Sequence, residues 1–298
     1  MTGSAVAPRS WLYVPATRPE LVAKALAGPA DAVVVDLEDA VPADAKDAAR
    51  DALVAALAQD ACVWRTKPLW VRTNHPATAW GAADLAALHD VAGTAVDGVR
   101  LPKAEDADLV ADVAGRLGRP LHLLVETALG LRNADVLARA HPQVTGIALG
   151  EADLLADLGG LDSSALAYAR GHVVATARAA GLGAPVMSVW TDLADLDGLR
   201  ADTERARALG FVGRSVVHPR QVPVVHEAFT PRPDEVAAAH RVVAALDAAT
   251  RRGSAVVVDD AGRFVDAAVV NRAKVVLGLA RRGDGAATTP PSPDQENR

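Results

Sequence analysis

The chain has one cysteine, Cys62, among its 298 residues. A single cysteine excludes an internal disulfide and a metal site built from several thiolates, so we expect a reducing compartment and a packed, unreactive thiol. Long apolar runs are missing too, because nowhere do about eighteen apolar residues follow one another without a charge. The N-terminal MTGSAVAPRS also lacks the apolar core of a signal peptide. We therefore expect a soluble, cytoplasmic protein with no membrane partner.

Several catalytic and binding signatures are absent as well. The sequence contains no glycine-rich phosphate loop, no GxGxxG after an apolar run, and no serine or cysteine in a nucleophile elbow. The net charge of −6 and the pI near 5.7 do not indicate a basic surface for phosphate groups. These absences argue against covalent catalysis, dinucleotide cofactors and nucleic-acid partners.

What the chain does have is a regular alternation of short apolar runs with longer segments rich in alanine and leucine. Runs that are apolar throughout predict parallel strands that are buried on both faces and wrapped by helices. Eight strand–helix repeats predict a (β/α)8 barrel, and an open doubly wound sheet is the alternative. The predicted strands are Trp11–Val14, Ala32–Asp36, Leu69–Arg72, Gly98–Leu101, Leu121–Val125, Gly146–Leu149, Pro185–Val189 and Phe211–Val217.

Segments with helical spacing of apolar residues lie between these strands. Several begin at a capping residue or a proline and end near a glycine, as at Gly181 and Gly210. The predicted helices include Pro19–Ala27, Ala43–Leu57, Glu105–Leu117, Ser164–Ala180 and Leu193–Leu209.

The pattern changes after the eighth repeat, where Pro231 and Pro233 interrupt it. A helix is predicted from Glu235 to Thr250, then a hairpin with its turn at Asp260-Ala261-Gly262, then a helix from Ala267 to Arg281. This appendage is too small to fold alone, so we expect it to cover the barrel mouth or to contact a neighbouring subunit.

The domain boundaries follow from these breaks. Residues 1–230 form the predicted catalytic barrel, and residues 231–282 form the predicted lid or oligomerisation segment. Residues 283–298 are rich in proline, serine, threonine and other polar residues. They cannot bury enough apolar surface, so we predict a disordered tail.

Charged residues gather at or directly after the ends of the predicted strands. In a barrel, the carboxyl ends of all strands meet at one mouth, which is where catalytic groups lie. Their positions therefore favour the barrel over the open sheet. These residues are Glu38, Asp39, Arg72, Lys103, Glu126 and Asp153.

Glu126 and Asp153 are 27 residues apart, which is about one strand–helix–strand unit, so they follow neighbouring strands. Two carboxylates at one sheet edge either repel each other or bind a cation. Mg²⁺ suits them better than Zn²⁺, because neither motif contains histidine or cysteine. The alternative is that Glu126 caps a helix or pairs with Arg132, and that Asp153 caps a helix over 154–158.

Arg72 ends the third predicted strand, where its guanidinium can hold a carboxylate or an oxyanion in a bidentate fork. It can equally be a structural partner for Glu38 or Asp39, and the two roles are compatible. One of these carboxylates is a candidate to orient Arg72 and the other to contact metal-bound water. Capping of the helix Ala43–Leu57 is the alternative for Asp39.

Arg72 and Glu126, at the expected mouth, are also candidates for contact with the substrate. Arg18 and Lys24 lie near the first strand–helix turn and are candidates to contact an anionic part of the ligand, with exposure to solvent as the ordinary alternative. Lys103 is likewise a candidate to contact an anionic ligand, with exposure to solvent as the ordinary alternative. We expect His218 to be a hydrogen-bonded loop residue.

Seven short motifs resemble, in order, the family of citrate lyase beta subunits, malyl-CoA lyases and citramalyl-CoA lyases. Each motif alone is weak, but the ordered set from Arg9 to Gln221 is specific. The resemblance implies a (β/α)8 barrel with Mg²⁺ that cleaves or forms a carbon–carbon bond between an acyl-thioester enolate and a 2-oxo acid. The motifs are RSWLYVPATRPE, ADAVVVDLEDAV, VRTN, GVRLPKAE, VETALGLRNA, GEADLLADLG and SVVHPRQ.

The resemblance also implies roles for single residues. The two metal carboxylates of the family match Glu126 in VETA and Asp153 in GEADL, and its substrate-binding arginine matches Arg72 in VRTN. Members that act on free CoA thioesters have a C-terminal segment that covers a neighbouring subunit's mouth and supplies an aspartate. GRFVDAAVV resembles that segment, with Asp266 at the matching position. We therefore expect a homo-oligomer, a trimer or hexamer, in which Asp266 acts on a neighbouring subunit.

The reaction that this resemblance implies is cleavage of a 3-hydroxyacyl-CoA, such as malyl-CoA or citramalyl-CoA, into an acyl-CoA and a 2-oxo acid. Mg²⁺ on Glu126 and Asp153 would hold the 2-oxo acid part, Arg72 would stabilise oxyanion charge, and Asp266 would protonate the enolate. Two alternatives stay open. One is hydrolysis of the same thioesters, and the other is a citrate lyase beta component that acts on a carrier-protein thioester.

Overall fold

The computed structural model describes residues 7–59, 66–91, 96–251, 262 and 264–286. Cys62 lies outside them. The chain divides into two compact units between His226 and Glu227, a few residues before the boundary expected at 230/231. The unit Ala7–His226 contains the sheet and the predicted site residues up to Asp153.

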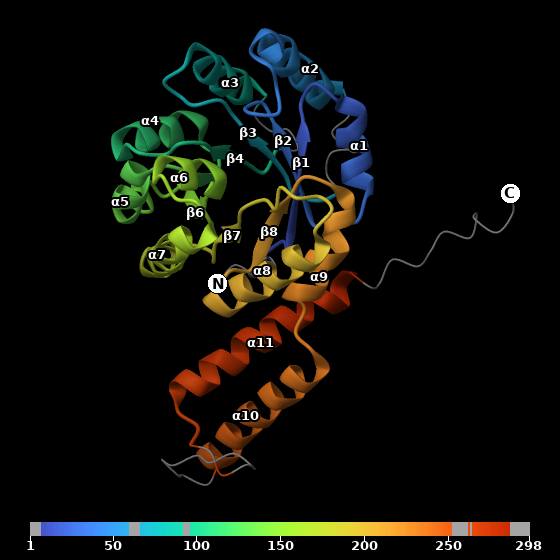
Figure 1. Ribbon diagram of the computed structural model, residues 1–298, viewed down its shortest axis with the longest axis vertical. Helices are drawn as coiled ribbons and strands as arrows, with labels where there is room; N and C mark the ends of the chain where they lie inside the picture. Colours follow the sequence, from blue (N-terminus) through green and yellow to red (C-terminus); the bar gives the residue numbers. More distant parts are fainter. Residues whose placement is uncertain (1–6, 60–65, 92–95, 252–261, 263, 287–298) are drawn as a thin grey trace, which may run out of the picture. The chain divides into compact units, whose positions relative to one another are not determined.

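Eight parallel strands form one sheet in the order β6-β5-β4-β3-β2-β1-β8-β7, and β6 also contacts β7, so that the sheet is a nearly closed barrel. Every neighbour in this order is also a neighbour in the chain except β1 and β8, the first and last strands, which pair as the closing of a barrel requires. A doubly wound sheet instead reverses its order at a switch point. The barrel prediction is confirmed, and Figure 1 shows the helices placed around the strands. The strands are β1 Ser10–Pro15, β2 Ala32–Asp36, β3 Leu69–Arg72, β4 Gly98–Leu101, β5 Leu121–Val125, β6 Val144–Leu149, β7 Val186–Met187 and β8 Gly213–Val216.

The helices of this unit begin and end at local signals. In α4, Asp106 accepts hydrogen bonds from the backbone N–H groups of Asp108 (2.8 Å) and Leu109 (3.2 Å), and Gly118 ends the helix at a φ of 59°, a value that glycine adopts without strain. The helices are α1 Pro19–Ala27, α2 Lys46–Gln59, α3 Ala79–Asp90, α4 Ala107–Leu117, α5 Ala128–Leu137, α6 Glu151–Asp157, α7 Ala167–Ala179, α8 Leu196–Leu209 and α9 Val222–Phe229, the last of which contains the boundary between the units, with short 3-10 turns η1 Ala43–Ala45, η3 Ser163–Leu166 and η4 Pro219–Gln221.

The predicted elements differ from the observed ones mainly at two places. Strand β7 is only two residues long, shorter than the predicted Pro185–Val189. Helix α3 is expected only as part of the third strand–helix repeat and without bounds, because its apolar residues are spread around the helix and give no single apolar face. Its start is nevertheless marked by Thr78, whose hydroxyl accepts a hydrogen bond from the N–H of Gly81 at 3.0 Å.

Aromatic side chains pack inside the barrel where a glycine on the neighbouring strand leaves space for the ring. Trp70 lies beside Gly98 and His122 beside Gly146 in the strand register. The Trp70 and His122 ring centroids are 4.0 Å apart. Burial, with a smaller contribution from the charge of Arg100, lowers the pKa of His122 to about 3, so this imidazole is neutral.

The second unit contains two long helices, α10 Pro233–Arg251 and α11 Ala267–Ala286, which pack against each other. Ala249, Val265 and Val270 form its buried apolar cluster. Helix α11 extends past the predicted end at Arg281, so residues 283–286 are helical and not part of a tail.

Other predictions for this unit lie outside the described residues. They concern residues 287–298 of the tail and most of the hairpin at Asp260-Ala261-Gly262, of which only Gly262 is described. None of the described helices combines the length and the apolar character that a membrane crossing requires.

Gly98 provides a test of how the barrel interior is packed. A Cβ atom there would lie 2.5 Å from Trp70 Cζ3 and 2.6 Å from the carbonyl oxygen of Pro120. Because the backbone oxygen cannot move away cheaply, we expect Gly98→Ala to lower the free energy of unfolding by about 1–3 kcal/mol. Gly115→Ala in α4 is the matched control, since its Cβ would meet nothing within 4 Å and should raise stability by roughly 0.5–1 kcal/mol. Urea unfolding measures both, and equal stabilities would contradict this packing.

Candidate active site

A cavity of about 520 Å³ opens at the carboxyl ends of the barrel strands. Four of the predicted site residues line it together: Asp39, Arg72, Glu126 and Asp153. Every strand of the barrel contributes to its wall, or the residues that directly follow that strand do. The structure therefore collects residues that are far apart in sequence in one concave site at the mouth of the barrel, where barrel enzymes hold their catalytic groups.

Arg72 is held by Asp36, its register partner on the neighbouring strand β2. Arg72 Nε and Nη2 donate to the two carboxylate oxygens of Asp36 at 2.8 and 2.7 Å, a bidentate pair. Burial alone would lower the pKa of Arg72, but its hydrogen bonds and charge interaction with Asp36 raise that pKa above its ordinary value. Asp36 was not among the predicted site residues, although its place at the end of a buried apolar strand is a signal that sequence reasoning could have used.

Glu38 and Asp39 also contact Arg72. Their carboxylate oxygens lie 2.9 and 3.1 Å from Arg72 Nη1. Burial raises the pKa of Glu38 in spite of its ion pairs, whereas Asp39 has a largely exposed side chain. Asp39 does not cap a helix, because η1 follows Pro42 and has no side-chain cap. The structural alternative for this acidic pair, as partners of Arg72, is therefore observed.

Two polar side chains hold the loop after β2 by hydrogen bonds to its backbone carbonyl oxygens. Lys46 Nζ donates to the carbonyl oxygens of Leu37 (3.1 Å) and Glu38 (3.0 Å). Asn74 Nδ2 donates to the same Leu37 oxygen at 2.9 Å and to Asp84 at 2.8 Å. These bonds fix the backbone that carries Glu38, whose buried carboxylate contacts Arg72 and Lys103 and does not itself line the cavity.

Lys103 lies between two carboxylates. Its Nζ is 2.7 Å from Glu38 Oε1 and 3.6 Å from Glu126 Oε2. Lys103 is also the one described non-glycine residue with a positive φ, 48°, which turns the chain directly after β4. Burial would lower the pKa of Lys103, but its hydrogen bond and charge interaction with Glu38 raise it. No sequence motif indicates this turn. The ordinary expectation for Lys103 was exposure to solvent, whereas the structure places its Nζ between two carboxylates.

Glu126 is a deeply buried acid of the cavity wall that lacks, in the described chain, a bidentate arginine partner such as Asp36 has. Only 2 % of it is exposed, and Oε2 has no hydrogen-bond partner among the described residues. Burial, the nearby charge of Glu38 and a smaller contribution from Asp153 raise its pKa to about 7, against the opposing charges of Lys103 and Arg72.

The space for the Glu126 side chain depends on Gly150. A Cβ atom at Gly150 would lie 2.4 Å from Glu126 Cγ. Glu126 does not cap α5, because Thr127 does so through a 3.0 Å bond from the N–H of Gly130. No ion pair joins Glu126 to Arg132 in the part of the chain that the structure describes. Neither structural alternative for Glu126 is observed.

Asp153 lies in the first turn of α6 and is exposed toward the cavity. It is not the cap that the alternative interpretation expected, since Gly150 stands at that position. The start of α6 is anchored by Glu151, whose two carboxylate oxygens accept from Arg170 at 2.6 and 2.8 Å, and Arg170 in turn donates to Asp202 at 3.0 Å. This buried network joins three helices, and its members are too far apart in sequence to be recognised from a motif.

Three other predicted residues do not reach the cavity wall. Arg18 pairs with Glu20 at 2.6 Å on the exposed start of α1, and Lys24 is exposed on the same helix. His218 is the hydrogen-bonded loop residue that was expected, because its Nδ1 accepts from the N–H of Arg220 at 3.1 Å.

Asp266 belongs to the second unit. Its carboxylate accepts a hydrogen bond from the N–H of Val269 at 2.8 Å. This contact places Asp266 directly before α11, as a cap for its first turn.

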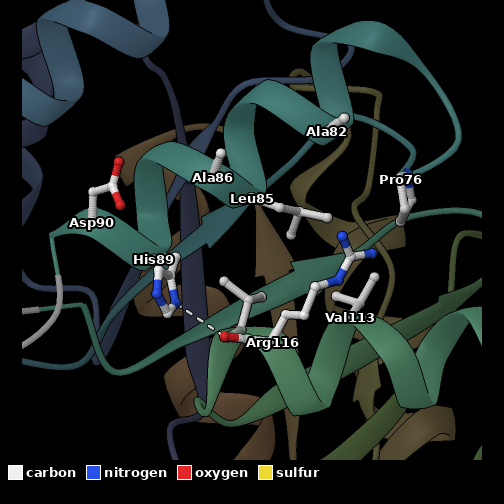
Figure 2. A pocket seen from close by; sticks show the side chains of 9 residues that line it. Pro76, Ala82, Leu85, Ala86, His89, Asp90, Val113 and Arg116 are labelled. Atoms are coloured by element: carbon white, nitrogen blue, oxygen red, sulfur yellow. Dashed lines mark hydrogen bonds between the residues drawn. The ribbon is translucent and has the colours of Figure 1, made fainter.

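A second hollow lies on the outer surface between α3 and α4 (Figure 2). Leu85, Val113 and the stem of Arg116 line it, and His89 Nδ1 lies 3.0 Å from the carbonyl oxygen of Arg116. None of the predicted site residues lies there. The mouth cavity is therefore the candidate active site.

In metal-free protein, the raised pKa of Glu126 makes stability depend on pH. The free carboxyl titrates near 4.5 and the native one near 7, so the native state binds more protons between these values. We expect the free energy of unfolding to fall as pH rises through this window, by up to about 3 kcal/mol. Glu126→Gln should remove the fall. Urea unfolding of both proteins in a chelator, between about pH 5 and pH 8, measures it, and the same pH dependence in both would contradict the burial of this charge.

Comparisons with known proteins identify the family of the chain. A family model described as HpcH/HpaI aldolase/citrate lyase matches residues 9–219. The chain is 38 % identical over 278 residues to a (3S)-malyl-CoA thioesterase of Cereibacter sphaeroides, covering 91 % of this chain and 94 % of that relative. It is 33 % identical over 304 residues to an L-malyl-CoA/beta-methylmalyl-CoA lyase of the same organism, covering 91 % and 94 %.

The likeness extends to solved structures. A crystal structure of CitE from Mycobacterium tuberculosis in complex with magnesium, acetoacetate and coenzyme A matches with a TM-score of 0.78 and 37 % identity, over 93 % of this chain and 99 % of that one. The expected resemblance is thereby confirmed. The chain belongs to the HpcH/HpaI aldolase/citrate lyase family and is an enzyme of its citrate lyase beta-like, acyl-CoA lyase and thioesterase branch.

Proposed function

We propose that the protein is a Mg²⁺-dependent carbon–carbon lyase that cleaves, or forms, a 3-hydroxyacyl-CoA such as malyl-CoA or citramalyl-CoA. The products of cleavage are an acyl-CoA and a 2-oxo acid. One observation carries the proposal: a buried carboxylate, Glu126, has an oxygen without a hydrogen-bond partner among the described residues and shares its cavity with Asp153 and Arg72.

The residues at the mouth fit Mg²⁺. Glu126 Oε2 is buried and has no hydrogen-bond partner among the described residues, and the charge of Asp153 helps to raise the pKa of Glu126, so the two carboxylates act on each other. No group of three or more metal-ligating side chains occurs among the described residues. Mg²⁺ does not need one, because it is commonly held by one or two carboxylates with water and substrate oxygens. Glu126 and Asp153 would hold the ion, which when bound polarises the substrate's oxygens and fixes their orientation.

Arg72 is the group that would stabilise oxyanion charge. Three carboxylates hold its guanidinium at the cavity wall, and the bidentate contact with Asp36 fixes its plane. Such an orientation costs little reorganisation when negative charge develops on the substrate. Lys103 would keep Glu38 and Glu126 close together by offsetting their repulsion.

The proton balance of cleavage requires two transfers. The 3-hydroxyl group loses its proton as the carbon–carbon bond breaks, and the resulting thioester enolate gains a proton at carbon. We propose Asp266 of the partner subunit for the second transfer, on the basis of the family resemblance of GRFVDAAVV. In the free chain this carboxylate is engaged with the N–H of Val269, so the transfer requires that it also reach the substrate.

Thioester hydrolysis is the second candidate, because a relative of this chain at 38 % identity is a (3S)-malyl-CoA thioesterase. The same carboxylates and arginine could serve it. The two reactions differ in their products, since hydrolysis releases free CoA and no 2-oxo acid.

A panel of 3-hydroxyacyl-CoA thioesters with Mg²⁺ tests the proposal, with acyl-CoA, free CoA and 2-oxo acid measured separately. We expect acyl-CoA and 2-oxo acid in equal amounts, and a loss of roughly a thousandfold in turnover for Glu126→Ala, Asp153→Ala or chelated protein. Asp108→Ala is the matched control, because Asp108 is also an exposed acid in the first turn of a barrel helix but does not line the cavity. Full turnover in a chelator would contradict the metal assignment, and free CoA without 2-oxo acid would replace lyase by thioesterase.

The contribution of a neighbouring subunit is tested by mixing variants. Asp266→Ala and Glu126→Ala subunits, each inactive alone, should recover about one quarter of wild-type activity when co-expressed, the statistical share of sites with both groups intact in a closed ring. Exchange of the acetyl-CoA methyl protons with solvent should fail in Asp266→Ala, while thioester binding persists. An inactive co-expressed mixture, or unchanged proton exchange, would remove Asp266 from this role.

A further inference from the structure

The barrel has a seam between β6 and β7, the two strands at the ends of the strand order. No strand ladder joins them in the described chain, whereas every other pair of adjacent strands is hydrogen-bonded. The seam lies at the proposed site, because Asp153 follows β6, Ser188 follows β7, and both line the cavity. Strand β6 therefore has a ladder on one side only, and the attachment of the helix that follows it comes from other groups.

Helix α6, which carries Asp153, has few anchors of its own. It is seven residues long, and its cap residue, Gly150, offers no side chain to the first turn. Within this fully described helix, Glu151 and Leu154 are the buried residues. Glu151 and Asp153 are two positions apart, which is about 200° around a helix axis, so they face nearly opposite sides. A group that holds Glu151 therefore sets the rotation of α6 that directs Asp153 to the cavity.

Side chains cross the seam where the ladder is missing. Glu151 donates its backbone N–H to Ser188 Oγ at 3.2 Å. The Glu151 carboxylate accepts from Arg170 Nε at 2.6 Å and from Nη2 at 2.8 Å, and the two residues are 9 % and 8 % exposed. A bidentate fork of this kind fixes the direction of the carboxylate as well as its distance.

The attachment continues from Arg170 to strand β8. Arg170 Nη1 donates to Asp202 Oδ1 on α8 at 3.0 Å, and Asp202 Oδ2 accepts from Arg214 Nη2 on β8 at 2.8 Å. Arg214 Nη1 also donates to Thr203 Oγ1 at 2.9 Å. Strand β8 forms ladders with both β7 and β1. Buried charges thus join the start of α6, on one side of the seam, to the paired strands on the other side.

We propose that Arg170 is a positioning residue, which closes the seam through Glu151 and holds Asp153 in the direction that Mg²⁺ binding requires. The inference rests on the proposed function, in which Glu126 and Asp153 hold the ion. A buried ion pair adds little net stability over an apolar pair of similar size, so stability alone does not account for a row of charged side chains at this place. Direction accounts for it, because Mg²⁺ accepts only a narrow range of ligand positions.

Titration of metal-free protein with Mn²⁺, followed by electron paramagnetic resonance, tests this role without turnover. Mn²⁺ takes the same octahedral oxygen coordination as Mg²⁺. We expect Arg170→Met to weaken Mn²⁺ binding by about tenfold to a hundredfold, the usual effect of losing a group that orients a metal ligand. Arg170→Lys keeps the charge without the planar fork, so it should recover only part of the affinity.

Two further variants separate position from stability. Arg9→Met is the matched control, because Arg9 is buried and pairs with Asp31 at 3.0 Å but does not line the cavity. It should lower the unfolding temperature and leave Mn²⁺ affinity unchanged. The double variant Glu151→Met, Arg170→Met removes both charges of one pair, so its unfolding temperature should approach that of wild type while its Mn²⁺ affinity stays low.

The double variant also gives an answer where Arg170→Met alone does not fold. If it bound Mn²⁺ as tightly as wild type, the ion pair would only support the fold, and the proposal would be overturned.

Asp153→Asn shows which inference fails. It should weaken Mn²⁺ binding, and adding Arg170→Met to it should weaken binding no further, because both changes act on the same ligand. Additive losses, or unchanged binding in Arg170→Met alone, would overturn the positioning role and leave the metal assignment intact. Unchanged binding in Asp153→Asn would contradict the metal assignment itself and, with it, this inference.

Discussion

The mouth of this barrel depends on the interaction of Arg72 with the carboxylates around it. Parallel strands end at one edge. Here β2 ends in Asp36 and acids follow β2, β5 and β6, so negative charge accumulates in a partly buried space. The bidentate contact between Arg72 and Asp36 offsets part of that charge and fixes the guanidinium plane. Lys103 does the same for Glu38 and, at longer distance, for Glu126. Without these two cations, the acids could not stay ionised and close together.

One carboxylate is left incompletely compensated by this arrangement. Glu126 keeps an oxygen without a hydrogen-bond partner in the described chain, and its pKa is raised to about 7. A site that is built to receive a cation has this character, because the cation supplies the missing interaction when it binds. Gly150 completes the arrangement by leaving space where any side chain would displace the Glu126 carboxylate.

The barrel interior contains a layer of aromatic side chains and, at the carboxyl ends of the strands, a cavity lined by charged side chains. Trp11, Trp70 and the neutral His122 form a packed aromatic layer. Arg100 lies against this layer through its contact with Trp11 and is among the residues that line the cavity. Outside the strands, the network of Glu151, Arg170 and Asp202 holds the start of α6, which carries Asp153. The scaffold thus determines the position of both proposed metal ligands by packing on one side and by buried ion pairs on the other.

The sequence by itself determined the elements and the edge at which function lies. Strands β2, β3, β4 and β5 have the predicted bounds, because apolar runs with polar ends are a local property of the chain. The spacing of Glu126 and Asp153 also placed them after successive strands. Only the tertiary structure decided which charges meet. Lys103 contacts Glu38 across 65 residues and Arg100 contacts Tyr13 across 87. Such pairs depend on the register and closure of the whole barrel, which no local pattern encodes. The same register brings Asp36 beside Arg72, where its carboxylate orients the guanidinium.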